Sequence, residues 1–217
     1  FSFLSMIPSL CRICPIISDT TDPVNNLTQL AMTFDPVYVK ILIIGKFQED
    51  FYDMKNLVIT GMGAVTPIGI GVGDYWQGIL DMKCGIEKIT RFHDDDLPIQ
   101  IAGEVKEFDP KDYMPSKLSK ETGMFMQFAY ASAKEAIEQS GINIDAEAGR
   151  IGIVMATALN GTAEITETET LYSVDGKKKV SPRFLPKIMG NLGAAHIAIS
   201  YGIHGQRLTV SPACSSG

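Results

Sequence analysis

Hydrophobic positions in residues 54–217 alternate between segments with helical spacing and short, continuously apolar runs. Between residues 119 and 140, phenylalanine, alanine and isoleucine recur at intervals of three and four, which predicts one helix with a single buried face. Gly141 follows in a position that commonly ends a helix. Residues 151–155 are apolar throughout, which predicts a strand buried on both faces of a covered parallel sheet.

Weaker patterns complete an alternation of strands and helices. β-branched residues predict a strand at 56–60, and Asp74 is a candidate N-cap for a helix through residue 80. The remaining predicted elements are a strand at 99–105, a helical region opened by Ser181-Pro182, a helix at 191–201 stopped by Gly202, and a strand at 207–211. This order implies an α/β fold built in layers.

Residues 1–53 show a different pattern. Pro8, Arg12 and Pro15 interrupt the apolar start of the chain, and a basic stretch and a small-residue cleavage site, both typical of signal peptides, are missing. Met54 opens a segment that reads like the natural start of a protein, so we expect one domain at 54–217. We expect residues 1–53 to be an extension that arose from read-through upstream of Met54 or from a faulty gene model.

Composition narrows the function classes. The formal charge of −6 argues against nucleic acid as the main partner, because a phosphate backbone needs a basic face. Four cysteines in 217 residues do not form a disulfide framework, which favours a reducing, cytoplasmic setting. No apolar run reaches the roughly 20 residues that span a bilayer, so we expect no membrane association.

Cys214 is the candidate nucleophile. It follows a predicted strand and precedes the small residues Ser215, Ser216 and Gly217, as in a sharp strand–turn–helix connection that exposes a side chain. A helix starting there would favour the thiolate. The alternative is a buried structural cysteine, which is common.

Several motifs resemble one enzyme family. The run Val210-Ser-Pro-Ala-Cys214-Ser-Ser-Gly217 is similar to the active-site cysteine motif of the β-ketoacyl-[acyl-carrier-protein] synthases, closest to the type II class of bacterial fatty acid synthesis. Other matching stretches, in the family's order, are Val58 to Gly69, Trp76 with Gly85-Ile86, Ser181 to Pro186 with Asn191, and Tyr201 to Gly205. The resemblance covers residues 54–217 and nothing before them.

The resemblance implies the thiolase-like fold, a five-layered αβαβα arrangement of which this chain would hold most of the N-terminal half, in a homodimer. It implies a decarboxylating Claisen condensation, in which Cys214 takes an acyl group from acyl-carrier protein and malonyl-carrier protein then attacks it. The backbone N–H of Cys214 would form half of an oxyanion hole. No metal or organic cofactor is implied, because phosphopantetheine arrives on the carrier protein.

The resemblance carries over to four further positions. Leu159 matches a position that limits acyl length, and Phe184 matches one that reaches the partner subunit's acyl pocket; plain core packing is the alternative for both. Lys117 and Lys120 match basic positions that face the acidic carrier protein. Glu121 breaks that basic patch, and a solvated helix face is the alternative for the two lysines.

The chain also departs from the family. The family's two catalytic histidines, its lysine and its second oxyanion donor lie in the C-terminal half, and this sequence stops three residues after Cys214. We therefore expect a fragment that does not condense substrates alone. Pro212 stands where the family usually has Thr. A noncatalytic partner like the chain-length factors of polyketide systems is an alternative, although those partners usually lack the cysteine.

Other patterns in the sequence suggest different sites. Gly61-Met-Gly63 after a strand suggests a dinucleotide loop and hence a nicotinamide-dependent oxidoreductase, but the glycine pattern fails at Thr66. Cys11 and Cys14 have no second pair at zinc spacing. The acidic run after His93 is best explained as a solvated loop. His196 is predicted to be a core histidine with its hydrogen bonds satisfied.

Overall fold

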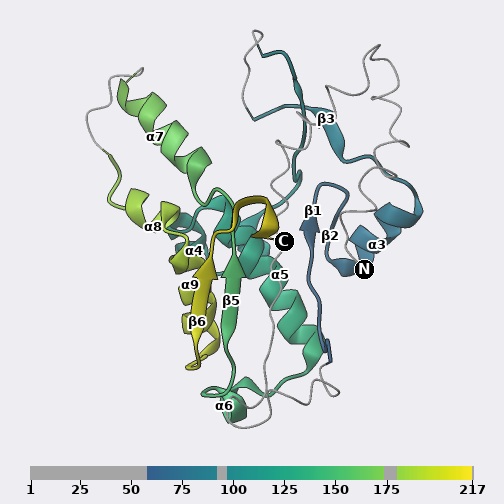
Figure 1. Cartoon of the computed structure of the whole chain (residues 1–217), viewed down its shortest axis with the longest axis vertical. Helices are drawn as coiled ribbons and strands as arrows, with labels where there is room; N and C mark the ends of the chain where they lie inside the picture. The colour runs from purple at the N-terminus through teal and green to yellow at the C-terminus, as the bar shows by residue number, and fades with distance from the viewer. Residues whose placement is uncertain (1–57, 92–96, 174–179, 217) are drawn as a thin grey trace.

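The computed structural model describes residues 58–91, 97–173 and 180–216. At its centre, strand β5 (Ile153–Ala156) runs parallel to strand β6 (Arg207–Val210), with Ile153 opposite Arg207 and Ala156 opposite Val210 (Figure 1). A parallel pair requires a crossover connection. Here the crossover contains the helices α7 (Thr162–Ser173), α8 (Phe184–Ile188) and α9 (Asn191–Tyr201). This topology confirms the α/β fold.

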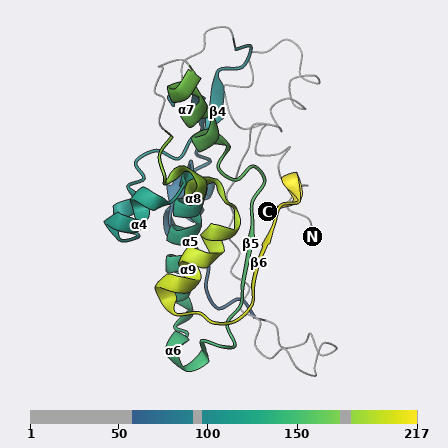
Figure 2. The same cartoon turned by 90° about the vertical axis from the view of Figure 1, so that its left-hand side faces the viewer.

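Helices α5 (Met124–Ser140) and α9 cover one face of the β5–β6 pair (Figure 2). Phe125, Met126 and Ala129 of α5 are buried with Ile153 and Met155 of β5 in the main core cluster. Burial of each of the larger apolar side chains stabilises the folded state by about 1.5–3 kcal/mol. The helices thereby hold the two strands from one side, with the carboxyl ends of the strands next to each other.

The predicted helix at 119–140 is two helices. α4 (Ser116–Glu121) ends before Thr122, whose backbone is extended (φ −106°, ψ 146°), and α5 starts at Met124. The break lies where α8 crosses, because a Cβ on Gly123 would overlap with the carbonyl oxygen of Lys187. From Met124 to Ser140 the predicted helix and its buried face are confirmed, and Gly141 ends it in the left-handed conformation (φ 63°).

The prediction that the strand at 151–155 is buried on both faces is wrong. Ile153 and Met155 are buried, but Val154 points to the other face and is 36% exposed. Its neighbour across the pair, Leu208, is 55% exposed. The described helices lie on one side of these strands, as Figure 2 shows, so the second face is uncovered within residues 58–91, 97–173 and 180–216.

The segment before α5 forms small elements rather than a strand in the main sheet. Residues 58–60 of the strand predicted at 56–60 have no strand structure, and Val58 and Ile59 are exposed because none of the described strands pairs with them. A hairpin of β1 (Val65–Thr66) and β2 (Gly69–Ile70) follows instead. The beginning of the predicted strand, Asn56 and Leu57, lies outside the described residues, as do residues 1–53.

The remaining elements shift by a few residues from their predicted positions. α3 (Val72–Leu80) is capped by Gly71, and Asp74 lies in its first turn instead of capping it. Arg183 precedes α8, so Pro182 is not its first residue; Ser181 accepts the backbone N–H of Arg183. The other elements are β3 (Ile86–Lys88), β4 (Ile101–Gly103), η4 (Pro110–Asp112), α6 (Ile144–Glu147) and η5 (Ala213–Ser216), with β3 and β4 antiparallel.

No helix in the described ranges is long and apolar enough to cross a membrane.

Candidate active site

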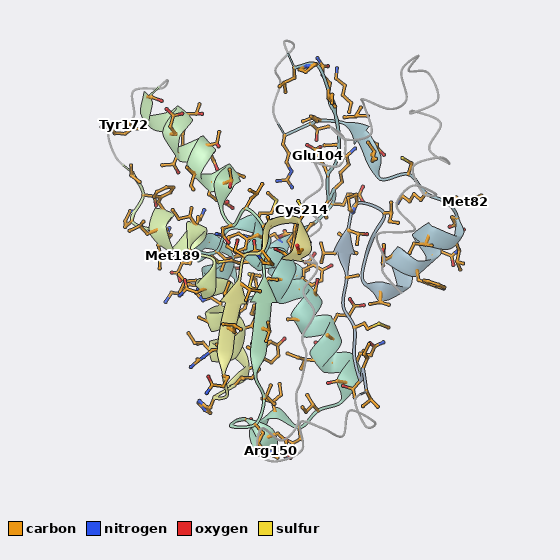
Figure 3. The ribbon with its side chains drawn as sticks, viewed as in Figure 1. Met82, Glu104, Arg150, Tyr172, Met189 and Cys214 are labelled. Carbon is orange, nitrogen blue, oxygen red and sulfur yellow. The ribbon has the colours of Figure 1, made fainter. Side chains whose placement is uncertain are left out.

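Cys214 lies at the carboxyl end of the central strand pair. Strand β6 leads directly into η5, which carries the cysteine just beyond the carboxyl end of the strand (Figure 3). The thiol is exposed and free of any disulfide. The alternative of a buried structural cysteine is therefore wrong, and the side chain is open to an incoming molecule.

The residue before Cys214 has a strained backbone. Ala213 adopts the left-handed conformation with φ 51°, which costs a residue with a Cβ about 1 kcal/mol. The backbone N–H of Ser215 donates to the carbonyl oxygen of Pro212 over 3.1 Å and closes the turn. This is the sharp connection that the small residues around Cys214 predict. Strain of this kind persists only where the surrounding structure enforces it.

A second loop lies beside this turn. The backbone N–H of Thr157, just after β5, donates to the carbonyl oxygen of Val210 over 3.1 Å. The next residue of each segment is bonded as well: the Ser211 hydroxyl donates to the carbonyl oxygen of Ala158 over 3.2 Å. Residues 157–161, which we call the β5 loop, are therefore joined to the residues that lead into Cys214.

Leu159 sits in the β5 loop and is 60% exposed. Core packing, the alternative given for this residue, is therefore wrong. Phe184, the first residue of α8, is half-buried. The β5 loop contacts α8 near Gly161, where an added Cβ would lie 2.7 Å from the Cα of Ile188. The structure thus places the loop of Leu159 between the Cys214 turn and the helix of Phe184.

Lys117 and Lys120 are both exposed on α4. Neither forms an ion pair with an acidic residue in the described parts of the chain. Glu121 ends the same helix and is half-buried. The two ammonium groups are available to an acidic partner, but this arrangement also fits a solvated helix face.

Gly61 and Gly63 serve packing in this structure. A Cβ on Gly61 would overlap with the carbonyl oxygen of Ala136, and one on Gly63 with that of Ser132, because this segment lies directly on α5. The side chain of Glu135 accepts the N–H groups of Ala64 (3.0 Å) and Val72 (2.7 Å). The two glycines are therefore explained by close packing on α5, without a dinucleotide.

Glu135 also borders a cavity that sequence analysis missed. The cavity has a volume of about 250 Å³ and lies between β1, α5 and η4, with Tyr113 and Lys134 in its wall. Burial, with smaller contributions from nearby carboxylates, raises the pKa of Tyr113. Cys214 does not line this cavity. Only the long-range folding of the hairpin onto α5 creates it, so no local sequence signal could have revealed it.

His196 is half-buried on α9, and its Nε2 has no hydrogen-bond partner among the residues that the structure describes. The prediction of a satisfied core histidine is therefore wrong, because the helices around α9 bring no acceptor or donor to that atom. Burial lowers the pKa of His196, and the Glu121 carboxylate opposes the shift. His204 is exposed.

No group of three or more histidine, cysteine, aspartate or glutamate residues in the described ranges could hold a metal ion. The acidic run after His93 and the Cys11–Cys14 pair lie outside these ranges.

Comparisons with known proteins agree on one family. A family model described as "Beta-ketoacyl synthase, N-terminal domain" matches residues 54–217. The 3-oxoacyl-[acyl-carrier-protein] synthase 2 of Coxiella burnetii is 36% identical over 166 residues, which cover 76% of this chain and 40% of that protein. The chain thus spans about 40% of the length of this curated relative.

Solved structures show the same fold. The ishigamide ketosynthase/chain length factor superposes with a TM-score of 0.63 at 24% identity, over 71% of this chain and 39% of that one. A ketosynthase in complex with its type II polyketide acyl-carrier protein superposes with a TM-score of 0.55 at 20% identity, over 71% of this chain and 41% of that one. At these identities the likeness establishes the ketosynthase-type α/β fold.

Proposed function

The chain belongs to the β-ketoacyl synthase family, and on that premise we propose that Cys214 is the acyl-accepting nucleophile of a 3-oxoacyl-[acyl-carrier-protein] synthase of type II. The observation that carries the proposal is the exposed, free thiol of Cys214 in a strained turn at the carboxyl end of β6. A side chain at such an edge is open to a substrate, while the strands behind it hold its position.

The proposed reaction has two steps. The Cys214 thiolate attacks the thioester carbonyl of an acyl-carrier protein, the carrier's thiol leaves, and the acyl group stays on Cys214. The malonyl group of a second carrier then loses CO₂, and the resulting carbanion attacks the acyl carbon and releases the Cys214 thiol. The Cys214 backbone N–H would stabilise the oxyanion that forms in each step. Phosphopantetheine comes with the carrier, so the chemistry uses no separate cofactor.

Acyl-carrier protein is the proposed partner. The exposed Lys117 and Lys120 on α4 support it, since an acidic carrier would be attracted to unpaired ammonium groups. The ketosynthase neighbour solved with its own carrier protein is consistent with it. Leu159 and Phe184 are proposed to contact the acyl chain, and a homodimer is proposed for the complete enzyme. A cytoplasmic site of action is proposed for the complete enzyme.

The match over 54–217 supports a domain that begins at Met54. The alternative of a noncatalytic chain-length-factor-like partner predicts no acyl transfer to this chain. Because Cys214 is present and exposed, we favour the catalytic role.

The first half-reaction tests the proposal. The chain is incubated with dodecanoyl-carrier protein, and intact mass with peptide mapping locates the acyl group. We expect one acyl group on Cys214 in the wild type and none in Cys214→Ala. A wild type that takes up no acyl group, or an acyl group on another residue, would contradict the proposed function.

The lysines are tested in the same assay. Charge reversal by Lys117→Glu with Lys120→Glu should raise the KM for dodecanoyl-carrier protein about tenfold, and leave transfer from dodecanoyl-pantetheine unchanged because that donor has no carrier surface. Lys88→Glu, an exposed change on β3, serves as the control. An unchanged KM in the double variant would reject the carrier contact.

A further inference from the structure

One side chain joins the β5 loop to the turn of Cys214. The Ser211 hydroxyl donates to the carbonyl oxygen of Ala158 over 3.2 Å, although the two residues are 53 positions apart. Among the side-chain hydrogen bonds of the residues that the structure describes, this one alone links residues 157–161 with residues 211–216. Pro212 has no N–H, so the next backbone position cannot donate to the loop.

The β5 loop otherwise holds its shape by itself. The N–H of Asn160 donates to the Thr157 hydroxyl over 3.3 Å, and the Thr162 hydroxyl donates to the Leu159 carbonyl oxygen over 2.6 Å. Asn160 adopts the left-handed conformation with φ 50°. These bonds fix the loop's own conformation, but they do not fix its distance from Cys214.

The opposite side of the loop rests on α8. An added Cβ on Gly161 would lie 2.7 Å from the Cα of Ile188, so the glycine backbone packs closely against that helix. Ser211 holds it on the other side. The backbone bond from Thr157 to Val210 ties the base of the loop to β6, and the bond from Ser211 to Ala158 is the tie next to Leu159. The position of Leu159 relative to Cys214 therefore depends on both bonds, and the Ser211 hydroxyl is the one that a side-chain substitution removes.

We propose that Ser211 is a positioning residue whose hydroxyl sets the distance between Leu159 and Cys214, and thereby the acyl chain lengths that Cys214 accepts. This inference rests on the proposed function. A single methylene changes discrimination in an apolar site about tenfold or more, so a small displacement of the loop changes the preferred length.

Three variants test the role. Ser211→Ala removes the donor, and Ser211→Thr keeps the hydroxyl. Ser173→Ala is the matched control, because its hydroxyl bonds within its own helix α7, to the Glu169 carbonyl oxygen at 2.7 Å, and not to the β5 loop or the Cys214 turn. The first readout is the ratio of Cys214 acylation rates with hexanoyl- and dodecanoyl-pantetheine. The second is hydrogen exchange of the Thr157 amide, which is bonded to Val210 at the base of the same loop.

In Ser211→Ala we expect the rate ratio to change about fivefold and Thr157 exchange to accelerate about fivefold, as for the loss of one hydrogen bond. Ser211→Thr and Ser173→Ala should stay within about twofold of the wild type, because the first keeps the hydroxyl and the second removes one unrelated to the loop.

Each other outcome has a defined meaning. Unchanged Thr157 exchange in Ser211→Ala shows that the bond does not hold the loop and overturns the inference. Faster exchange with an unchanged rate ratio shows a purely structural bond and overturns the positioning role. If the wild type accepts no acyl group from either thioester, the proposed function fails and the positioning role falls with it, while the exchange data still report whether the bond exists.

Discussion

At the residue scale, His196 shows how burial alone changes a titration. Its Nε2 is buried, and no group in the described part of the chain forms a hydrogen bond with it. The imidazolium would lose hydration there, so burial lowers the pKa of His196 below its usual value of 6.5, against the weaker opposing effect of Glu121. In the unfolded chain the same side chain keeps its usual pKa.

The sign of the resulting pH dependence follows from linkage. Below about pH 6.5 the unfolded chain binds a proton at His196, whereas the folded chain binds it only at lower pH. The free energy of unfolding therefore falls as the pH drops from 7.5 to 5.5. His196→Gln should show a smaller fall in urea titrations at these two pH values. His204→Gln, at an exposed position, should keep the wild-type fall. Equal falls in wild type and His196→Gln would contradict this explanation.

At the element scale, the packing of the segment 61–63 on α5 explains the two glycines there. The overlaps that a Cβ would cause are with backbone carbonyl oxygens of α5, which cannot rotate away as a side chain can. Glu135 and Gln139 of α5 then accept backbone N–H groups of Met62, Ala64 and Val72. The glycines permit the approach, and the helix side chains satisfy the segment's backbone.

Substitution by alanine should therefore have opposite effects on the free energy of unfolding at Gly63 and at Gly73. Gly63→Ala forces the segment off α5 and should lower the free energy of unfolding by more than about 2 kcal/mol. Gly73→Ala, in exposed α3 with nothing within 4 Å of the added Cβ, should raise it by up to about 1 kcal/mol through helix propensity. Equilibrium denaturation measures both, and comparable stability of the two variants would contradict the packing role.

At the scale of the whole molecule, the main consequence of the layer arrangement is the face of the β5–β6 pair that residues 58–91, 97–173 and 180–216 leave uncovered. Val154 and Leu208 lie opposite each other on this face and are exposed. Other large apolar side chains are exposed too, among them Leu159, Leu185 and Met189. Apolar surface of this kind favours association with other molecules.

We therefore expect the chain to self-associate through this face. Leu208→Thr keeps strand propensity and removes apolar area, so it should lower the weight-average mass in sedimentation equilibrium at a fixed concentration. Ile199→Gln, an exposed position on α9 away from the strand pair, is the control and should not change it. A monodisperse wild-type monomer would rule out this association.

The sequence by itself determined the features that depend on local periodicity and backbone freedom. The spacing of Phe125, Phe128 and Ala129 sufficed for α5 because a helix repeats every 3.6 residues whatever surrounds it. Gly141 and Gly202 were recognisable as helix ends because left-handed residues are usually glycine. The small residues around Cys214 indicated a sharp turn after a strand, and the structure has one.

The tertiary structure decided what depends on neighbours far along the chain. Whether Val154 is covered depends on which layers face it, and the break at Gly123 depends on the crossing of α8. The bond from Ser211 to Ala158 joins residues 53 positions apart, and no periodicity encodes it. A local sequence pattern predicts the conformation of one segment. A functional site is formed by several segments, and only the folding of the whole chain places those segments side by side.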